Sequence, residues 1–252
     1  MHFGIHLPHA GERATPALIS RFAIQAEALG FADVWVSEHI ILPRTQFPRP
    51  LPFYEPVLTL TWVAAVTERV RLGTSVLVLP MRHPIPLAKE LATLQNLSDG
   101  RLILGAGVGW LAPEFAALGA PFHQRGRRMD EGIALMRAVW TQDPVTFPTK
   151  YIPAEITDMT MTPLPIAPIP LWICVFRFRS NALPMSVNWC RVVTVQNTAG
   201  LQIGAFVVKF NLPSHPIEER GLIRGEPHAE DVIIKLDRAV IAKRMQQTEP
   251  GD

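Results

Sequence analysis

Residues 71–108 read RLGTSVLVLPMRHPIPLAKELATLQNLSDGRLILGAGV, and this stretch decides the fold. A near-continuous apolar run over 71–79 predicts a buried strand, and a second buried strand is expected at 101–108. Between them, residues 86–100 carry the spacing of a helix that exits through Asp99-Gly100. Apolar strands joined by an amphipathic helix are typical of parallel sheets covered by helices.

The same strand-then-helix unit recurs on both sides of this stretch. Thr15-Pro16 offers a capping hydroxyl and a first-turn proline for a helix that Gly30 ends. Further strands are expected at 3–7, 32–36 and 169–173, and further helices at 56–67 and 125–140. This series fits half of a (β/α)₈ barrel or most of a doubly wound sheet.

Glycine spacing separates these two folds. A dinucleotide-binding sheet needs G-x-G-x-x-G in its first strand-to-helix turn, but the turn PHAGERAT at 8–15 has one glycine. The later run Gly105-Ala106-Gly107-Val108-Gly109-Trp110 puts tryptophan where the third glycine belongs. We therefore expect residues 1–252 to form a single domain, an α/β barrel of the (β/α)₈ TIM type.

Composition excludes several classes of protein. The 252 residues carry 24 Lys+Arg against 22 Asp+Glu, a net charge of +2, which argues against a nucleic-acid binder. With 48% apolar residues the chain can bury a core, and its two cysteines argue against a disulfide-stapled secreted fold. The sequence shows neither a signal peptide nor an apolar run long enough to span a membrane. We expect a cytoplasmic protein that binds neither nucleic acid nor membrane.

The pattern changes after the strand at 169–173. From Met159 to Ile217 there is no Asp or Glu, residues 192–210 resemble strands, and helical spacing returns only at 230–244. The outer helices of a barrel normally carry charges of both signs. Two interpretations of the atypical stretch 174–228 stay open: a strand-rich insertion, or a disrupted reading frame inside a barrel gene.

Candidate site residues follow from one rule, that active sites of barrels lie at the carboxyl ends of the strands. The rule selects the strand-end residues His6, Pro8, His9, Ser37, Glu38, His39, Ser75 to Pro80, Gly107, Gly109 and Trp110. This set contains no metal cluster, no hydrolase nucleophile elbow and no phosphate-binding lysine motif. Glycines, an aromatic residue, a histidine and few acids suit an organic cofactor that performs the chemistry itself.

Structural interpretations compete at each position. Glu38 is also suited to a capping acid beside a half-buried His39, and Gly107 and Gly109 to close packing. Trp110 also fits plain packing, and Arg82 fits either a residue that reaches a ligand or, by default, an ordinary polar loop.

Four blocks in order resemble the luciferase-like monooxygenase superfamily. They are HFGIHLPHAG at 2–11, ALGFADVWVSEHI at 28–40, the stretch 69–110 from RVRLG to GAGVGW, and RGRRMDEGIALMRAVW at 125–140. The resemblance ends near residue 173 in PIPLWI and is strongest to the oxidoreductases of actinobacteria that depend on the deazaflavin coenzyme F-420. It implies a barrel, often homodimeric, with coenzyme F-420 or FMN at its mouth and a small-molecule substrate.

The resemblance also implies roles for single residues. Glu38 and His39 would lie by the cofactor ring as catalytic residues, with His39 suited to proton transfer because histidine titrates near neutral pH. Ser75-Val76 would form a cis peptide behind the ring. Together with these two residues, Gly107, Gly109 and Trp110 would bind the cofactor. Sugar-phosphate dehydrogenases of the family carry an acid at the position of Trp110, which disfavours that activity.

One departure from the family leaves two functions open. The family follows PIPLWI with two glycines and a helix that holds the cofactor phosphate, whereas here Cys174-Val175-Phe176 follows and no glycine occurs before Gly200. The first hypothesis is an oxidoreductase that transfers a hydride to or from a small organic substrate, with monooxygenation still open. The alternative is a catalytically impaired relic that has lost the phosphate site.

Overall fold

The computed structural model describes residues 4–49 and 51–173 in full, and only the backbone at residue 3 and over 189–196 and 202–210. The expected helix at 230–244 and most of the atypical stretch 174–228 lie outside these residues. The main strands are β1 (Phe3–His6), β2 (Asp33–Val36), β3 (Arg71–Thr74), β4 (Leu77–Val78), β5 (Leu102–Gly107), β8 (Leu171–Ile173), β9 (Trp189–Gln196) and β10 (Gln202–Phe210). The helices are α1 (Pro16–Ala28), α2 (Pro56–Ala64), η1 (Leu79–Met81), α3 (Pro84–Leu97), α4 (Ala112–Ala117), η2 (Phe122–Gln124) and α5 (Arg125–Thr141).

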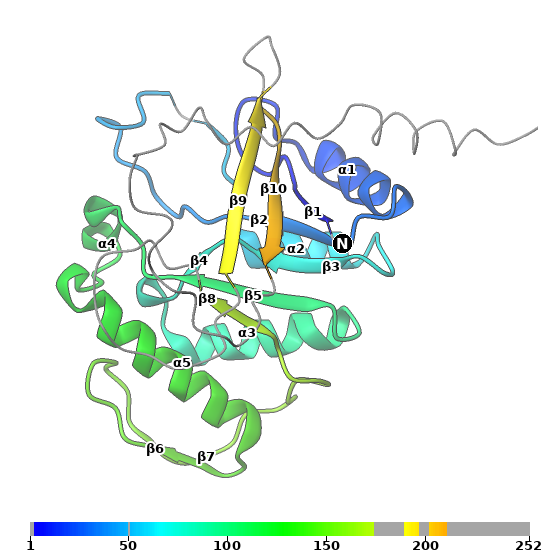
Figure 1. The fold of residues 1–252 in the computed structure, drawn as a ribbon. Coiled ribbons are helices and arrows are strands. Elements are labelled where there is room, and N and C mark those ends of the chain that lie inside the picture. Colours follow the sequence, from blue (N-terminus) through cyan, green and yellow to red (C-terminus); the bar gives the residue numbers. More distant parts are fainter. Residues whose placement is uncertain (1–2, 50, 174–188, 197–201, 211–252) are drawn as a thin grey trace, which may run out of the picture. The chain divides into compact units, whose positions relative to one another are not determined.

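The strands expected from apolar runs form a parallel sheet (Figure 1). β1 pairs with β2, β2 with β3, and β3 with β5, all in parallel. β4 and β8 also pair in parallel with β5. The sheet therefore brings the carboxyl ends of β1, β2, β3 and β5 to neighbouring positions, as the strand-end rule requires.

Helices begin where the sequence supplies caps. The Thr15 hydroxyl accepts a hydrogen bond from the Leu18 N–H at 3.2 Å, which confirms the expected start of α1. Glu55 caps α2 by accepting from the Leu58 N–H at 2.6 Å. α3 begins at Pro84, two residues before the expected start, because the His83 ring accepts from the Ile85 N–H at 3.3 Å.

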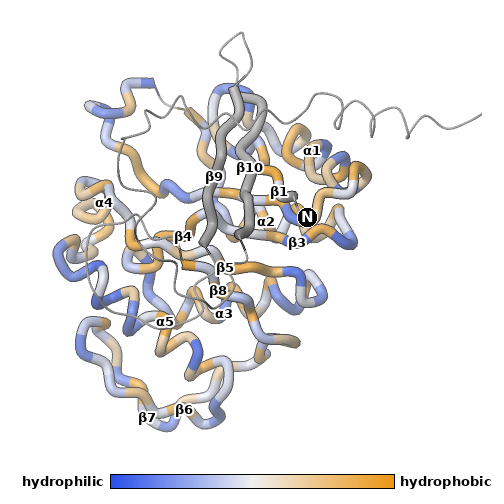
Figure 2. The backbone as a smooth tube through the Cα atoms, viewed as in Figure 1, coloured by the Kyte–Doolittle hydropathy of each residue, from blue (hydrophilic) through white to orange (hydrophobic). Residues whose placement is uncertain are grey.

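The two faces of the sheet are packed differently. One hydrophobic cluster joins buried residues of α1, α2, α3 and α5 to outward residues of the strands, among them Leu72 and Leu104. A separate cluster of Trp35, Ile103 and Trp172 contains no helical residue. Helices on one face only distinguish a barrel wall from a doubly wound sheet, whose helices cover both faces. β5 is buried along its whole length, and Figure 2 shows hydrophobic residues along it.

Trp35 fills the face without helices. It is fully buried, and its indole lies against the glycines of both neighbouring strands. A Cβ on Gly73 would come within 2.2 Å of the Trp35 ring, and one on Gly4 within 2.3 Å of its Nε1. Only glycine fits at these two positions, because the indole occupies the space that a side chain would need.

Three features differ from the strand-and-helix series expected from the sequence. The run 71–79 is divided into β3, β4 and η1, and a cis peptide bond between Ser75 and Val76 lies between β3 and β4. The short helix α4 was not expected. A separate antiparallel hairpin, β6 (Val145–Phe147) and β7 (Ile156–Met159), occupies the excursion before β8.

β9 and β10 confirm strands within 192–210. They pair antiparallel with each other, and β10 pairs antiparallel with β1, from Phe3 opposite Val208 to Ile5 opposite Phe206. The second neighbour of β1 is thus an antiparallel strand, unlike the parallel pairs among β1, β2, β3, β4, β5 and β8. Among the described helices, none is long and apolar enough to cross a bilayer.

Candidate functional site

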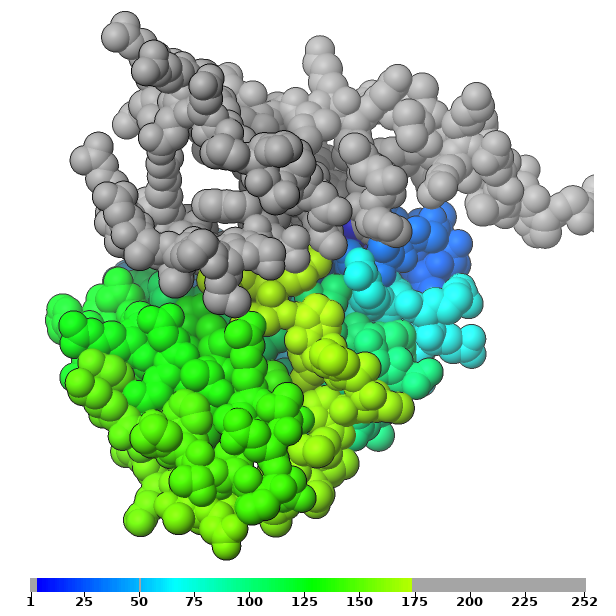
Figure 3. Space-filling model, turned by 60° about the horizontal axis from the view of Figure 1, so that its bottom comes forward, coloured from blue at the N-terminus to red at the C-terminus, as the bar shows by residue number. Residues whose placement is uncertain are grey.

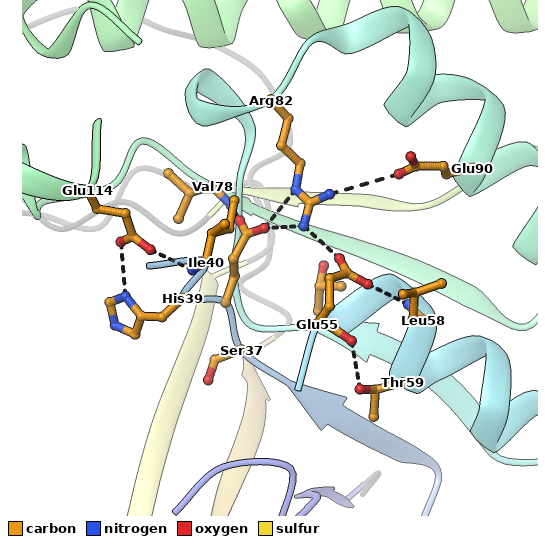
Figure 4. Close-up of polar contacts among 12 residues, drawn as sticks. Ser37, His39, Ile40, Glu55, Leu58, Thr59, Val78, Arg82, Glu90 and Glu114 are labelled. Atoms are coloured by element: carbon orange, nitrogen blue, oxygen red, sulfur yellow. Dashed lines mark hydrogen bonds and ion pairs between the residues drawn. The ribbon is translucent and has the colours of Figure 1, made fainter. Parts of the chain in front are cut away.

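His39 lies just beyond β2 and is held by a carboxylate from a distant part of the chain. Its Nδ1 is 3.0 Å from Glu114 Oε2, and its side chain is 20% exposed (Figure 4). Glu114 Oε1 also accepts from the Ile40 N–H at 2.6 Å and the Ile41 N–H at 3.2 Å. Glu114 thereby fixes both the histidine ring and the backbone that follows it.

The electrostatics of this pair define the histidine tautomer. Burial alone would raise the pKa of Glu114, but the hydrogen bonds from His39 and the two N–H groups outweigh burial and lower it. Glu114 is therefore a carboxylate, which only accepts hydrogen bonds, so His39 must donate from Nδ1. The lone pair of the neutral ring then lies on Nε2, which is suited to exchange a proton with a ligand.

Aromatic rings surround His39 on several sides. Its ring centroid is 5.3 Å from that of Phe53, 6.0 Å from Phe47 and 6.2 Å from Trp110. Trp110 itself is 65% exposed. The structure thus brings Trp110 to His39, as expected if both belong to one site.

Glu38 lies in a different environment from its neighbour. It is 4% exposed, and it accepts hydrogen bonds from the Val78 N–H at 2.6 Å and from Arg82 Nε at 2.7 Å. Arg82 also pairs with Glu55 at 2.6 Å and lies 3.9 Å from Glu90. Figure 4 shows this network on the opposite side of the chain from the His39 ring.

These contacts give Glu38 a structural role, because it ties the end of β2 to Val78 and Arg82. Burial raises the pKa of Glu38 above its ordinary value, although the Arg82 guanidinium and the Val78 N–H oppose that rise. Arg82 lies in the loop between η1 and α3, as expected, but its side chain is only 16% exposed and pairs with carboxylates. A catalytic role for Glu38 stays a prediction.

Ser75 and Val76 stand at the junction of β3 and β4, where the cis peptide bond implied by the resemblance is present. The Ser75 N–H donates to the Val36 carbonyl at 2.7 Å, which anchors this junction to β2. The Ser75 hydroxyl oxygen is buried and has no hydrogen-bond partner among the described residues. A buried hydroxyl without a partner is unusual and calls for a ligand or water.

The glycines of β5 are required by close packing. A Cβ on Gly107 would lie 2.5 Å from Val76 Cγ2, and one on Gly105 would lie 1.9 Å from the Thr74 carbonyl oxygen. Gly109 has a φ of +74°, and a Cβ there would meet Val78 and Phe115 within 2.7 Å. The packing interpretation therefore explains Gly107 and Gly109, and their part in cofactor binding stays a prediction.

Two histidines lie close together at the first strand end, His9 buried and His6 half-buried. The His6 and His9 ring centroids are 5.0 Å apart. The Ser37 N–H donates to His9 Nε2 at 3.1 Å, which ties the loop after β1 to the end of β2. Burial and the neighbouring His9 lower the pKa of His6 from 6.5 to about 4, so His6 is neutral at physiological pH.

Sequence reasoning missed Glu114 and the role of Arg82. Glu114 lies 75 positions from His39 in the sequence and on a helix of only six residues, so neither periodicity nor spacing connects the two. A signal for Arg82 was available: Glu38 follows a strand that is buried along its whole length, and a buried carboxylate needs a charged partner.

A cavity of about 290 Å³ lies elsewhere, between α5 and the segment that leads into β8. Figure 3 shows α5 in green beside the yellow-green residues before β8. The cavity is mostly apolar and shares no residue with the strand-end set, so the candidate site is not there. Within the described ranges, no group of three histidine, cysteine or acidic side chains could hold a metal ion.

Comparison with known proteins gives a family and relatives. Residues 1–177 match the family model described as luciferase-like monooxygenase. An F420-dependent glucose-6-phosphate dehydrogenase from Kineococcus radiotolerans is 36% identical over 170 residues, which cover 65% of this chain and 48% of the relative. An uncharacterized protein from Mycobacterium tuberculosis is 36% identical over 60% of this chain and 57% of its own length. The chain spans about half the length of the curated relatives that it matches.

Solved structures resemble the same part of the chain. A monooxygenase from Streptomyces bottropensis has a TM-score of 0.60 at 30% identity and covers 70% of this chain and 54% of its own. An F420-dependent secondary alcohol dehydrogenase in complex with an F420–acetone adduct shares the fold, with a TM-score of 0.60 at 24% identity over 69% of this chain and 53% of its own. The fold is therefore of the TIM-barrel type of these luciferase-like proteins.

Proposed function

The chain belongs to the luciferase-like monooxygenase family, and on that premise we propose that it is an oxidoreductase that uses coenzyme F-420 or FMN. In this proposal the chain moves a hydride between the bound cofactor and a small organic substrate. The observation that carries the proposal is the His39–Glu114 pair, which lies at the strand ends where a barrel binds its ligands.

The described residues fit the ring half of such a cofactor. The Ser75 hydroxyl is a buried polar group without a partner in the described part of the chain, and it can bind a ring oxygen or nitrogen. Val76 and Gly107 are in close contact beside it, and Trp110 is exposed enough to form a wall. The positions where the family holds the phosphate follow residue 173 and lie outside the described residues.

The chemistry divides between cofactor and chain. When bound, the cofactor supplies a carbon that gives or accepts a hydride. His39 Nε2 takes a proton from a substrate hydroxyl during oxidation, or gives one to a substrate carbonyl oxygen during reduction. The Glu114 carboxylate stabilises the imidazolium that forms and keeps the ring oriented through Nδ1. The aromatic rings of Phe47, Phe53 and Trp110 provide an apolar wall beside the imidazole.

A second candidate, the relic without a functional phosphate site, is favoured by one observation. β1 pairs on its second side with the antiparallel strand β10, where a closed parallel barrel would place a parallel strand. In this case the site around His39 keeps its geometry but cannot hold the cofactor tightly.

Turnover measurements test the proposal. Reduced coenzyme F-420 and reduced FMN are each mixed with the chain and a panel of small ketones and aldehydes without oxygen, and cofactor oxidation is followed by absorbance. We expect oxidation with one cofactor, and a rate at least about 100-fold lower for His39→Ala. A second set with oxygen separates hydride transfer from monooxygenation. Equal rates for both proteins would remove His39 from the mechanism.

A further inference from the structure

The surface around His39 is apolar. The ring centroids of Phe47, Phe53 and Trp110 lie 5.3 to 6.2 Å from that of His39. Ile40 and Ile41, which follow it directly, are 45% and 52% exposed. Exposed large apolar side chains that gather around one polar group mark a ligand site more often than a plain surface.

Two charged side chains near this aromatic cluster, Glu114 and Arg82, are already engaged with other protein groups. Glu114 is 2% exposed and binds His39 and two backbone N–H groups. Arg82 is turned away from the ring and pairs with Glu38, Glu55 and Glu90. A phosphate ester needs guanidinium or ammonium donors, and Arg82 cannot serve without leaving the Glu38 charge buried and unpaired.

Two further cations among the described residues, Arg44 and Arg49, lie on the loop that carries Phe47. Arg44 is exposed and lies three residues before Phe47, so it is a described cation that an anionic substrate could use. Arg49, further along that loop, is 3.5 Å from Glu12. Replacement of Arg44 therefore tests whether the substrate is anionic or uncharged.

We propose that the substrate is an uncharged molecule with an aromatic or alicyclic body that bears a carbonyl or hydroxyl group. This inference rests on the proposed function and differs from what the names of the sugar-phosphate dehydrogenase relatives suggest. The apolar body packs against Trp110, Phe47 and Phe53, and the oxygen meets the imidazole of His39. Trp110 determines the specificity, because it offers the largest exposed ring.

Ligand-observed saturation-transfer NMR tests this inference on the intact chain, with acetophenone and glucose 6-phosphate as probes. We expect acetophenone to bind, and its affinity to fall about tenfold or more in Trp110→Ala but to stay unchanged in Arg44→Ala. Both substituted side chains are exposed, so both variants should fold. Each titration is run with and without cofactor.

The results that would contradict this inference differ from those that would contradict the proposed function. Glucose 6-phosphate binding that is lost in Arg44→Ala would overturn the inference. Absence of acetophenone binding in every titration would overturn it as well. Cofactor binding to the same sample, followed by cofactor fluorescence, decides separately whether the oxidoreductase proposal stands.

Discussion

At the scale of single residues, Glu114 controls the state of His39. Replacement by Gln removes the carboxylate that requires Nδ1 to donate, so the two ring tautomers become closer in energy. We expect Glu114→Gln to change the ¹⁵N shifts of the His39 ring. Buried hydrogen bonds to a charged group are involved, so the free energy of unfolding at pH 7 should fall by about 1–3 kcal/mol.

The stability effect of Glu114→Gln should depend on pH. Because folding lowers the pKa of Glu114 below its ordinary 4.5, its stabilisation is fully present above that pH and is lost as the pH falls through the folded-state value. Urea unfolding should therefore show a difference between wild type and variant that shrinks below about pH 4.5. A difference independent of pH would contradict the assignment of an ionised Glu114.

The lowered pKa of His6 leads to a second prediction, about how the free energy of unfolding depends on pH. The unfolded chain binds the His6 proton more tightly than the folded one, because burial lowers the folded-state pKa from 6.5 to about 4. Stability should fall as the pH drops from about 6.5 to about 4, by roughly 3 kcal/mol at most. Urea titrations of wild type and His6→Phe measure this contribution. An equally steep loss in the variant would show that His6 is not its source.

Gly107 and Gly126 form a matched pair of glycines. A Cβ on Gly107 would collide with Val76, whereas one on Gly126 in α5 meets nothing within 4 Å. We expect Gly107→Ala to cost about 1–3 kcal/mol of stability and Gly126→Ala to leave it unchanged or raise it by up to about 1 kcal/mol. Thermal unfolding of both variants measures the difference. Equal stabilities would contradict the close packing of β5 against Val76.

At the residue scale, the sequence predicts positions better than partners. Ser37, Glu38 and His39 could be placed at a strand end from the apolar run before them. The different environments of Glu38 and His39 could not be predicted. They depend on Arg82 and Glu114, which come close to these two residues only in the tertiary fold.

At the scale of elements, Arg82 connects three of them. It joins Glu38 after β2 to Glu55, which caps α2, from a position just before α3. Arg82→Met should cost about 3–5 kcal/mol, since it leaves the buried Glu38 charge unpaired. The control Glu90→Gln should change stability by less than about 1 kcal/mol, because Glu90 is half exposed and 3.9 Å away. Comparable losses in the two variants would contradict a buried network centred on Glu38.

Elements were predictable where burial on both faces made the sequence apolar. β2 and β5 are buried along their whole length, and both follow from their apolar runs. The short helix α4 and the β6–β7 hairpin were not predictable, because segments of three to six residues have too few positions for a period to show. The division of the run 71–79 was indicated by the resemblance and not by periodicity.

At the scale of the whole molecule, a missing glycine fingerprint favoured the barrel, and the one-sided helix layer agrees with it. The resemblance implied by the four sequence blocks is confirmed by the family match over residues 1–177. The homodimer and the single domain over 1–252 stay predictions. The stretch after residue 173 was not predictable, because it lacks both the helical stripes and the glycine pair of the family.

The central claim is that this chain binds a flavin-type cofactor at the strand ends around Ser75, His39 and Trp110. Fluorescence titration with coenzyme F-420 and, separately, with FMN tests it most directly, with thermal unfolding of the same samples. We predict saturable binding of one cofactor at micromolar concentration, and stabilisation by about 2.7 kcal/mol when the ligand is at 100 times its dissociation constant. A well-folded sample that neither binds nor is stabilised by either cofactor would contradict the claim and favour the relic.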